Sequence, residues 1–206
     1  MMDFASPGHI VKAEGAMPSP QHIDEAVPEP NEAQGQMFDQ IYEQYFDFAW
    51  ANLRRLGIPA AHLEDAVQEL FIVVYRRLGE FAGRSSMKTW LAGIAWRIAS
   101  EYRRHESRKG GAEPLPDTLI APGRDPLGAA VHAEALRQLD SLLAQLDKEK
   151  RVVFVLAELE QLSVPEIAQA LAVNVNTVYS RLRVARRTFD EALRLSKTGA
   201  RGDNDD

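Results

Sequence analysis

Apolar residues recur every three or four positions along two long stretches of this 206-residue chain. This is the spacing of α-helices that bury one face. The first stretch, residues 37–105, predicts three helices, separated by LGIPAAH at 56–62 and by the loop GEFAGRSS at 79–86. The period resumes near residue 131 and continues to about 195. No segment alternates as a convincing β-strand would and no internal repeat is visible, so the pattern predicts an all-α fold.

Segments rich in proline and glycine lie outside these helical stretches and divide the chain. Residues 1–36 carry five prolines and no sustained helical period, which predicts a disordered acidic leader. Residues 106–130 have the composition of a flexible linker, and residues 196–206 form a polar tail. The sequence therefore predicts two small helical domains, residues 37–105 and 131–195, joined by a tether.

The third predicted helix, MKTWLAGIAWRIASEYRRH at 87–105, has two faces of different character. One face collects the apolar residues of a packed helix. The other face places a second tryptophan among cations and small residues: Gly93, Trp96, Ser100, Arg103 and Arg104, with Arg97 at its edge. The pattern alone leaves two interpretations open for Trp96, because a neighbouring helix could cover it or its face could touch nucleic acid.

A helix-turn-helix is predicted within LSVPEIAQALAVNVNTVYSRLRVARRTF at 162–189. Ser163 and Glu166 have the spacing of a capping box, Pro165 suits a first helical turn, and AVNV supplies the turn. In the second helix the apolar residues form a core side, and polar side chains point outward: Thr177, Tyr179, Ser180, Arg183 and Arg187. Such a face suits the major groove of DNA. The alternative is a helical hairpin whose arginines only solvate its surface.

The composition restricts the chemistry that the chain could perform. Cysteine is absent, which excludes disulfides, thiol catalysis and cysteine-ligated zinc, and the five histidines show no metal-ligand spacing. We therefore expect no catalytic residues, no metal and no cofactor. No apolar run has membrane-spanning length and no secretory signal is recognisable, so a cytoplasmic protein without membrane insertion is expected.

The formal net charge of −6 argues at first against a protein that binds nucleic acid. Its distribution changes this view. Residues 1–47 hold nine acidic residues and one lysine, whereas residues 76–109 hold nine cations and three acids. The chain therefore has cationic segments that could contact phosphates.

Two motifs in the first domain, DAVQELF at 65–71 and TWLAGIAW at 89–96, precede the linker and the helix-turn-helix. In this order and spacing they resemble the extracytoplasmic-function (ECF) sigma factors of bacterial RNA polymerase, over about residues 38–195. The resemblance implies a subunit that directs the polymerase to specific promoters and assists strand opening, without covalent chemistry of its own. Its implied partners are the polymerase core, promoter DNA and an anti-sigma factor.

The resemblance also implies roles for the residues at matching positions. The DAVQELF helix would dock on the clamp helices of the polymerase through Asp65, Gln68, Glu69 and Phe71. The minus-ten promoter element would meet Phe81, Arg84, Ser85, Trp96, Arg97, Ser100, Arg103 and Arg104. The minus-thirty-five element would meet Asn174, Thr177, Tyr179, Ser180, Arg181, Arg183, Arg186 and Arg187.

Two positions depart from the pattern of the family. Many relatives carry asparagine at the position of Arg97 and arginine at that of Tyr179, so the promoter sequences of relatives should not be transferred to this protein. The apolar run at 152–159 is interpreted first as core. A seat for the flap of the polymerase is the alternative for that run.

Two other classes of protein stay open on the residues alone. A one-component helix-turn-helix regulator would use residues 37–105 as a sensor or dimerisation domain and would bind a symmetric duplex site. The basic, aromatic third helix argues against that class. A small nucleic-acid enzyme would need clustered carboxylates or a metal site, and Asp65 with Glu69 is explained more simply as a docking face.

Overall fold

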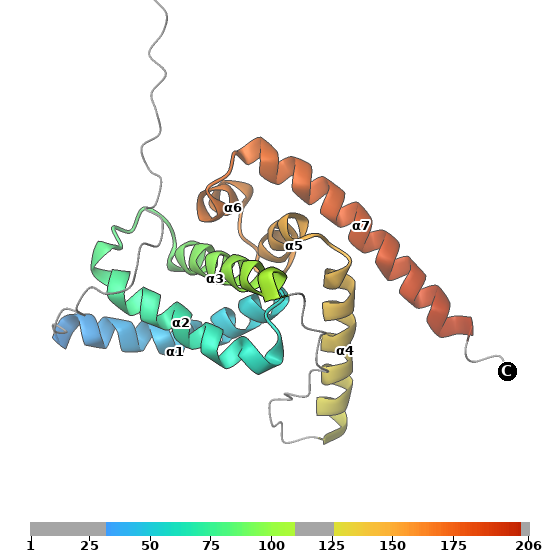
Figure 1. The fold of residues 1–206 in the computed structure, drawn as a ribbon, viewed down its shortest axis with the longest axis horizontal. Coiled ribbons are helices and arrows are strands. Elements are labelled where there is room, and N and C mark those ends of the chain that lie inside the picture. Colours follow the sequence, from blue (N-terminus) through green and yellow to red (C-terminus); the bar gives the residue numbers. More distant parts are fainter. Residues whose placement is uncertain (1–31, 110–125, 203–206) are drawn as a thin grey trace, which may run out of the picture.

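Nine helical segments make up the part of the chain that the computed structural model describes, residues 32–109 and 126–202 (Figure 1). They are α1 (Glu32–Arg55), α2 (Ala60–Arg77), the 3-10 turn η1 (Leu78–Glu80), α3 (Met87–Lys109), α4 (Pro126–Ala144), α5 (Lys148–Phe154), the π-helical turn η2 (Val155–Leu159), α6 (Val164–Leu171) and α7 (Val175–Gly202). These ranges contain no strand, which confirms the predicted all-α fold. None of their helices is long and apolar enough to cross a bilayer.

Several helices extend beyond the limits that the apolar period predicted. The first starts at Glu32 rather than at 37, and α3 continues to Lys109 rather than 105. Likewise α4 starts at Pro126 rather than 131, and α7 continues to Gly202 rather than 195. The apolar period registers only turns that carry an apolar face, so helical turns without one escape it.

The predicted leader and linker fall mainly on residues 1–31 and 110–125, which lie outside the described residues, as do residues 203–206 at the end of the predicted tail. Residues 196–202 of that tail belong to α7. The division into domains at those segments stays a prediction. We call α1 to α3 the N-terminal unit and α4 to α7 the C-terminal unit.

The N-terminal unit closes around the apolar face of α2. All the positions that the period selects there are buried: Leu63, Ala66, Val67, Leu70, Phe71, Val74 and Leu78. Aromatic rings of α1 cover one edge of this core. The ring of Phe46 stacks on that of Phe71 at a centroid distance of 6.3 Å, and the ring of Tyr42 lies 4.6 Å from Phe71. Aromatic contacts of this kind stabilise a core beyond the burial of their area.

The first helix ends at a glycine with a left-handed backbone. Gly57 has a φ of 99°, a conformation that a side chain disfavours. Its N–H donates to the carbonyl of Arg54 at 2.9 Å, and the N–H of Ile58 donates to that of Leu53 at 3.2 Å. These two bonds satisfy carbonyls that the end of the helix would otherwise leave without donors.

Two arginines bind the remaining carbonyls at this helix end. Arg103 of α3 donates from Nη1 to the oxygen of Leu56 at 2.5 Å, and Arg151 of α5 donates from Nε to the oxygen of Arg55 at 2.6 Å. Cations at a helix C-terminus are stabilised by the helix dipole. Because Arg103 and Arg151 belong to different units, the end of α1 is a point where the units join.

The predicted helix-turn-helix is formed by α6 and α7. The backbone N–H and the hydroxyl of Ser163 donate to Oε2 of Glu166 at 2.8 and 2.6 Å, so the predicted capping box is confirmed. The hydrogen bonds from Ser163 lower the pKa of Glu166. The turn bends at Ala172, which has a φ of 54°, and Val173 N–H then donates to the carbonyl of Ala168 at 3.0 Å.

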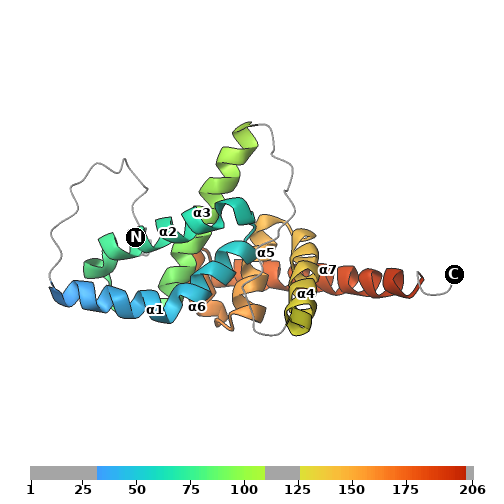
Figure 2. The same ribbon diagram turned by 90° about the horizontal axis from the view of Figure 1, so that it is seen from below.

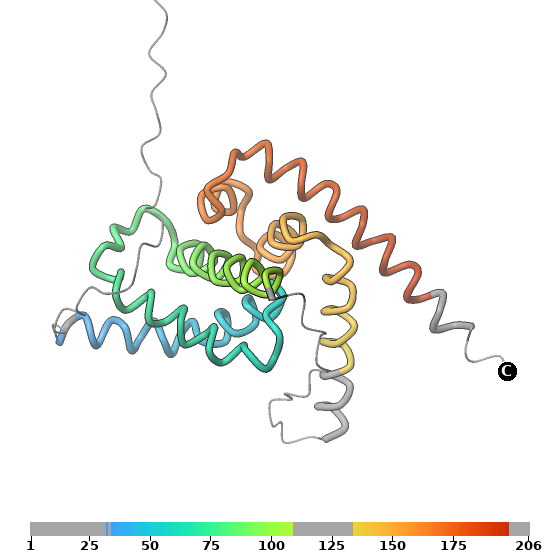
Figure 3. The backbone as a smooth tube through the Cα atoms, in the orientation of Figure 1, coloured from blue at the N-terminus to red at the C-terminus, as the bar shows by residue number. Residues whose placement is uncertain are grey.

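The last helix packs its apolar side on α5 and continues past α4 (Figure 3). Val178, Leu182 and Ala185 are buried, and the ring of Phe189 stacks on that of Phe154 at a centroid distance of 4.5 Å. These are the core positions that the sequence predicted. Residues 152–156 of the preceding apolar run are all buried as well, which supports the core interpretation of that run.

The two units pack against each other through α3, which contacts α1 and α2 on one side and α6 on the other (Figures 1 and 2). One continuous hydrophobic cluster includes Leu91 of α3 together with Val152 and Ile167 of the C-terminal unit. The crossing requires a glycine at Gly93, because a Cβ there would lie 2.9 Å from the carbonyl oxygen of Ala170. At Gly93 the second face of α3 is therefore in close contact with α6.

Replacing Ala172 with glycine should stabilise the protein by about 1 kcal/mol, because glycine adopts the left-handed region without the steric cost that alanine carries. We expect the Tm to rise by a few degrees in thermal unfolding followed by circular dichroism. The matched control is Ala192→Gly, inside α7, which should lower stability by about 1 kcal/mol. A lower Tm for Ala172→Gly would contradict our description of the turn.

Candidate nucleic-acid interface

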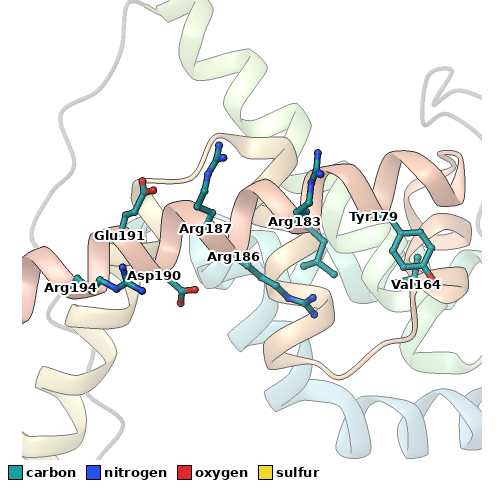
Figure 4. Close-up of a pocket in the computed structure, with 9 residues that line it drawn as sticks. Val164, Tyr179, Arg183, Arg186, Arg187, Asp190, Glu191 and Arg194 are labelled. Carbon is teal, nitrogen blue, oxygen red and sulfur yellow. The ribbon is translucent and has the colours of Figure 1, made fainter.

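An exposed stripe of aromatic and cationic side chains runs along α7. Tyr179, Arg183 and Arg187 recur every four residues and are exposed, Tyr179 to 58%. They line a surface hollow of about 640 Å³. Figure 4 shows Arg183 and Arg187 pointing to the same side of α7, with Arg186 on the other side. The stripe offers phosphate-binding guanidinium groups and a planar ring on one accessible face.

Two other predicted contacts of this helix are engaged within the protein. Arg181 donates from Nη2 to Glu149 Oε2 at 2.8 Å. Arg186 donates from Nε to Glu158 Oε1 at 2.8 Å. Both carboxylates belong to the α5–η2 segment, so these arginines face their own unit. Arg181 is thus half-buried in an ion pair, whereas Arg186, although paired, stays 57% exposed and lines the same hollow as Arg183 and Arg187.

The start of α7 uses its predicted contact residues for local hydrogen bonds. Asn174 Oδ1 accepts from the N–H of Asn176 at 2.8 Å, as a residue that begins a helix does. The hydroxyl of Ser180 donates to the carbonyl of Thr177 at 3.0 Å. Asn174 and Ser180 nevertheless stay exposed at the end of α7 that a major groove would receive.

On α3, the predicted contact residues form a compact group around Arg103. Its guanidinium lies 5.1 Å from the ring centroid of Trp96, in a cation–π arrangement, and Nη2 donates to Ser100 Oγ at 3.4 Å. Burial lowers the pKa of Arg103, although a guanidinium stays charged at neutral pH. Trp96, Ser100 and Arg103 thus form one face of a ring, a hydroxyl and a cation.

The remaining predicted residues of this region lie elsewhere. Phe81 packs on Trp90 at a ring-centroid distance of 5.1 Å, and Arg84 extends from the exposed loop beside it. Burial lowers the pKa of Arg97, the nearby charge of Arg77 on α2 lowers it further, and Glu101 raises it. Arg97 therefore lies on the side of α3 that faces α2. The structure therefore does not gather all eight predicted residues into a single site. Ser85 is partly buried next to Arg84 in the loop, and Arg104 is exposed next to Arg103 on α3.

The predicted docking ridge on α2 is only partly a surface. Asp65, Gln68 and Glu69 are exposed, but Phe71 is 3% exposed and packs beneath the aromatic rings of α1. Phe71 nevertheless lines a hollow between α1 and α2, and its role in docking stays a prediction. Ile72, 44% exposed, is the apolar side chain that the ridge presents instead.

Two hollows flank this ridge. One, of about 830 Å³, lies between α1 and α2 and has an aromatic lining that includes Phe38, Tyr42 and Trp50. The other, of about 270 Å³, lies between α2 and α3 and is lined by two histidines, three carboxylates and three further residues: His62, Asp65, Ala66, Glu69, Ile98, Glu101, Tyr102 and His105. Partial burial raises the pKa of Glu69, and the carboxylate of Glu101 raises it further. The charged form of Glu69 is therefore destabilised, and a cationic partner would stabilise it.

Sequence analysis missed three polar residues that the structure brings together. Lys88 Nζ donates to the carbonyl of Glu160 at 2.7 Å and lies 3.4 Å from its carboxylate. Thr89 is buried beside them and donates to Glu166 at 3.4 Å. Glu160 stands four residues after Leu156, on the buried face of its own segment. The signal that the sequence offered for this contact was Glu160, a charged residue at a position where a core residue is expected.

Comparison with known proteins gives matches to both units. Two families match the sequence, described as Sigma-70 region 2, over residues 41–109, and Sigma-70, region 4, over residues 136–189. The chain is 32% identical over 153 residues to the ECF RNA polymerase sigma-E factor of Escherichia coli K12, covering 69% of this chain and 80% of that protein. It is 31% identical over 165 residues to the RNA polymerase sigma-H factor of Pseudomonas aeruginosa, covering 76% and 86%.

Two solved structures are similar in fold. CnrH in complex with the cytosolic domain of CnrY matches with a TM-score of 0.60 and 24% identity, over 80% of this chain and 94% of that chain. The sigma factor RpoE in complex with the anti-sigma factor NepR from Bartonella quintana matches with a TM-score of 0.62 and 20% identity, over 77% and 98%. Both matches span the N-terminal and C-terminal units together.

Replacing Glu69 with glutamine should raise the Tm at neutral pH. The folded protein binds the Glu69 proton more tightly than the unfolded chain does, so the ionised carboxylate opposes folding above its raised pKa. The gain should disappear as the pH falls and Glu69 becomes protonated in both states. Thermal unfolding of both proteins across the acid range measures this, with Glu43→Gln on α1 as an exposed control. An equal or lower Tm for Glu69→Gln at neutral pH would contradict the assignment.

Proposed function

This chain belongs to the extracytoplasmic-function (ECF) sigma factors, and from that premise we propose which of its surfaces hold the promoter and which hold the polymerase. A sigma factor of this type directs the RNA polymerase core to specific promoters and assists strand opening at initiation, and this is the function of the protein. Sigma factors are initiation factors rather than enzymes by themselves. Family membership also removes the alternative of a one-component regulator.

The exposed stripe of Tyr179, Arg183 and Arg187 carries our assignment of the minus-thirty-five contact. It lies on the second helix of the helix-turn-helix, the position that enters a major groove in such motifs. Asn174 and Thr177 at the start of α7 would approach base edges, while the arginines would hold phosphates. We assign Arg181 and Arg186 to ion pairs within the unit instead, because Glu149 and Glu158 already engage them.

For the minus-ten element we propose the group around Trp96 and Arg103, together with Phe81 and Arg84 of the neighbouring loop. An opened strand needs a planar or apolar surface for an unstacked base and cations for its backbone. Trp96 and Phe81 supply the surfaces, and Arg84 and Arg103 supply the cations. Arg97, which faces α2, would act at the edge of this site.

The polymerase would dock on the α2 ridge. Asp65, Gln68 and Glu69 present a polar and negatively charged edge, and Ile72 adds an exposed apolar anchor beside the aromatic hollow of α1. Apolar anchors surrounded by charge pairs are typical of strong protein interfaces. A cationic surface on the clamp helices would relieve the unfavourable charge of Glu69 and Glu101.

Further partners and the location of the protein are also proposals. We propose that an anti-sigma factor holds this protein inactive, since the related RpoE structure contains one. We place the protein in the cytoplasm, where its polymerase acts, and we assign it no covalent chemistry, metal or cofactor. Contact with the polymerase flap stays part of the proposal, but not through the buried run at 152–156.

The function predicts discrete transcripts when the protein, bacterial core polymerase and genomic DNA fragments are combined in a run-off assay. The double variant Asp65→Lys/Glu69→Lys should lower core affinity by about a hundredfold and remove these transcripts, because two favourable charge contacts become repulsive. Core affinity is measured by fluorescence anisotropy of labelled protein.

The control for this pair is Glu43→Lys, an exposed charge reversal on α1 away from the ridge. It should leave core affinity and transcripts unchanged, and circular dichroism should show that both variants fold. Transcripts that persist undiminished in the Asp65→Lys/Glu69→Lys protein would refute the docking assignment. A wild-type protein that yields no transcripts with any core polymerase would refute the function.

Removing Arg187 should weaken binding to promoter fragments about equally for all sequences, because a phosphate contact carries no base information. The slope of log affinity against log salt should become less steep by about one unit for Arg187→Ala. Arg186→Ala is the matched control, since Glu158 neutralises that arginine. If Arg186→Ala changed the slope and Arg187→Ala did not, our choice of the α7 face would be wrong.

A further inference from the structure

Glu160, the residue that follows η2, links the C-terminal unit to two cations of the N-terminal unit. Its carboxylate accepts from Arg55 of α1 at 2.5 Å and lies 3.4 Å from Lys88 of α3, whose Nζ also donates to the Glu160 carbonyl. The Glu160 side chain is 8% exposed. A buried carboxylate with two cations is strongly destabilised if its partners leave, so this contact holds the units together.

Two further polar contacts cross the same boundary. Arg151 of α5 donates from Nε to the backbone carbonyl of Arg55 at 2.6 Å, and Arg54 donates to Asp140 of α4 at 3.0 and 2.8 Å. Burial is the largest of the effects that lower the pKa of Arg151. We call these contacts the seam: Arg54 with Asp140, Arg55 and Lys88 with Glu160, and Arg151 with the Arg55 carbonyl. The seam borders the apolar cluster that both units share, which includes Leu91, Val152 and Ile167. Unlike these apolar side chains, the charged groups of the seam can each be solvated when the units separate.

Closure along the seam covers the α3 face that we assign to the minus-ten strand. Gly93, Trp96, Ser100 and Arg103 share this face by their helical spacing. At one end Gly93 lies against the backbone of Ala170 in α6. At the other end Arg103 lies close enough to Arg151 for their charges to interact. Trp96 and Ser100 lie between these ends and are each only partly exposed.

The closed arrangement also contains unfavourable features. Asn52 is completely buried, and neither its side-chain nitrogen nor its oxygen has a hydrogen-bond partner among the described residues. It shares a face of α1 with Phe48, which contacts Lys88, and with Arg55, which binds Glu160. Next to Glu160, η2 is a π-helical turn and Gln161 has a left-handed φ of 59°. Orphaned amides and strained turns of this kind favour a second conformation and are frequent at switching elements.

On the basis of the proposed function, we propose that this protein masks its own minus-ten surface, with the seam as the latch and Glu160 as its central residue. The closed protein leaves the α2 ridge and the α7 stripe exposed. It can therefore meet the polymerase and duplex DNA, but it does not bind an opened strand until α6 leaves α3. When the two units separate, water reaches the side-chain amide of Asn52, and Arg103 and Trp96 become accessible to DNA at the same time.

Two single substitutions test the latch by different physical routes. Glu160→Gln removes the charge that Arg55 and Lys88 share. Gly93→Ala places a methyl group 2.9 Å from a backbone oxygen of α6, and it favours the helical state of α3 itself. Each has a matched control within the chain: Glu158→Gln, whose carboxylate pairs inside the C-terminal unit, and Gly35→Ala, a helical glycine with open space around it.

Opening is measured by energy transfer between dyes on Gln44→Cys and Gln169→Cys, two exposed positions in a chain without native cysteine. Binding to a random-sequence single-stranded DNA is measured in parallel by anisotropy. We expect Glu160→Gln and Gly93→Ala to lower energy transfer and to raise DNA affinity about tenfold, which corresponds to about 1.4 kcal/mol. The controls and the affinity for core polymerase should stay at the wild-type values.

Each other outcome counts against the proposal. Unchanged energy transfer in both test variants would show that the seam is not a latch. Lower energy transfer without tighter DNA binding would show that closure masks nothing. Because neither readout uses transcription, a failure of the run-off assay would refute the proposed function while leaving the latch to stand or fall on these two measurements.

Discussion

The packing of α3 on both of its faces is the constraint on which the rest of the structure depends. One face completes the core of the N-terminal unit with α1 and α2, and the other receives α6 at a distance that only a glycine at position 93 allows. Small residues permit this double contact, because Ala92, Ala95 and Ala99 are all fully buried along the helix. The two units share one hydrophobic cluster at this contact, and the charged side chains of the seam lie beside it.

Charge is divided among surfaces in a way that the net value of −6 conceals. The α2 ridge carries carboxylates, the α7 stripe carries arginines, and the cations of α1 and α3 meet the acids of the C-terminal unit at the seam. A sigma factor must hold an enzyme with one surface and nucleic acid with two others. In our proposed assignment these tasks lie on different helices, and only the α3 surface depends on the relative position of the units.

Local sequence patterns predicted what local physics determines. The helical period selected every buried position of α2, and the spacing of Ser163 and Glu166 identified the capping box. The same reasoning cannot register partners that are distant in the chain. Arg186 pairs with Glu158, 28 residues away, and Arg55 pairs with Glu160 across 105 residues. These contacts, and the latch that we propose from them, required the structure.

The central claim is that the closed protein cannot complete promoter recognition, and reversible crosslinking tests it most directly. Arg54 and Asp140 are in contact across the seam, and the chain contains no cysteine, so an Arg54→Cys/Asp140→Cys protein can be closed with a short disulfide-containing bismaleimide. Run-off transcription is then compared before and after a thiol cleaves the crosslink. We predict no transcripts from the crosslinked protein and recovery after cleavage. Equal transcription in both states would contradict the account.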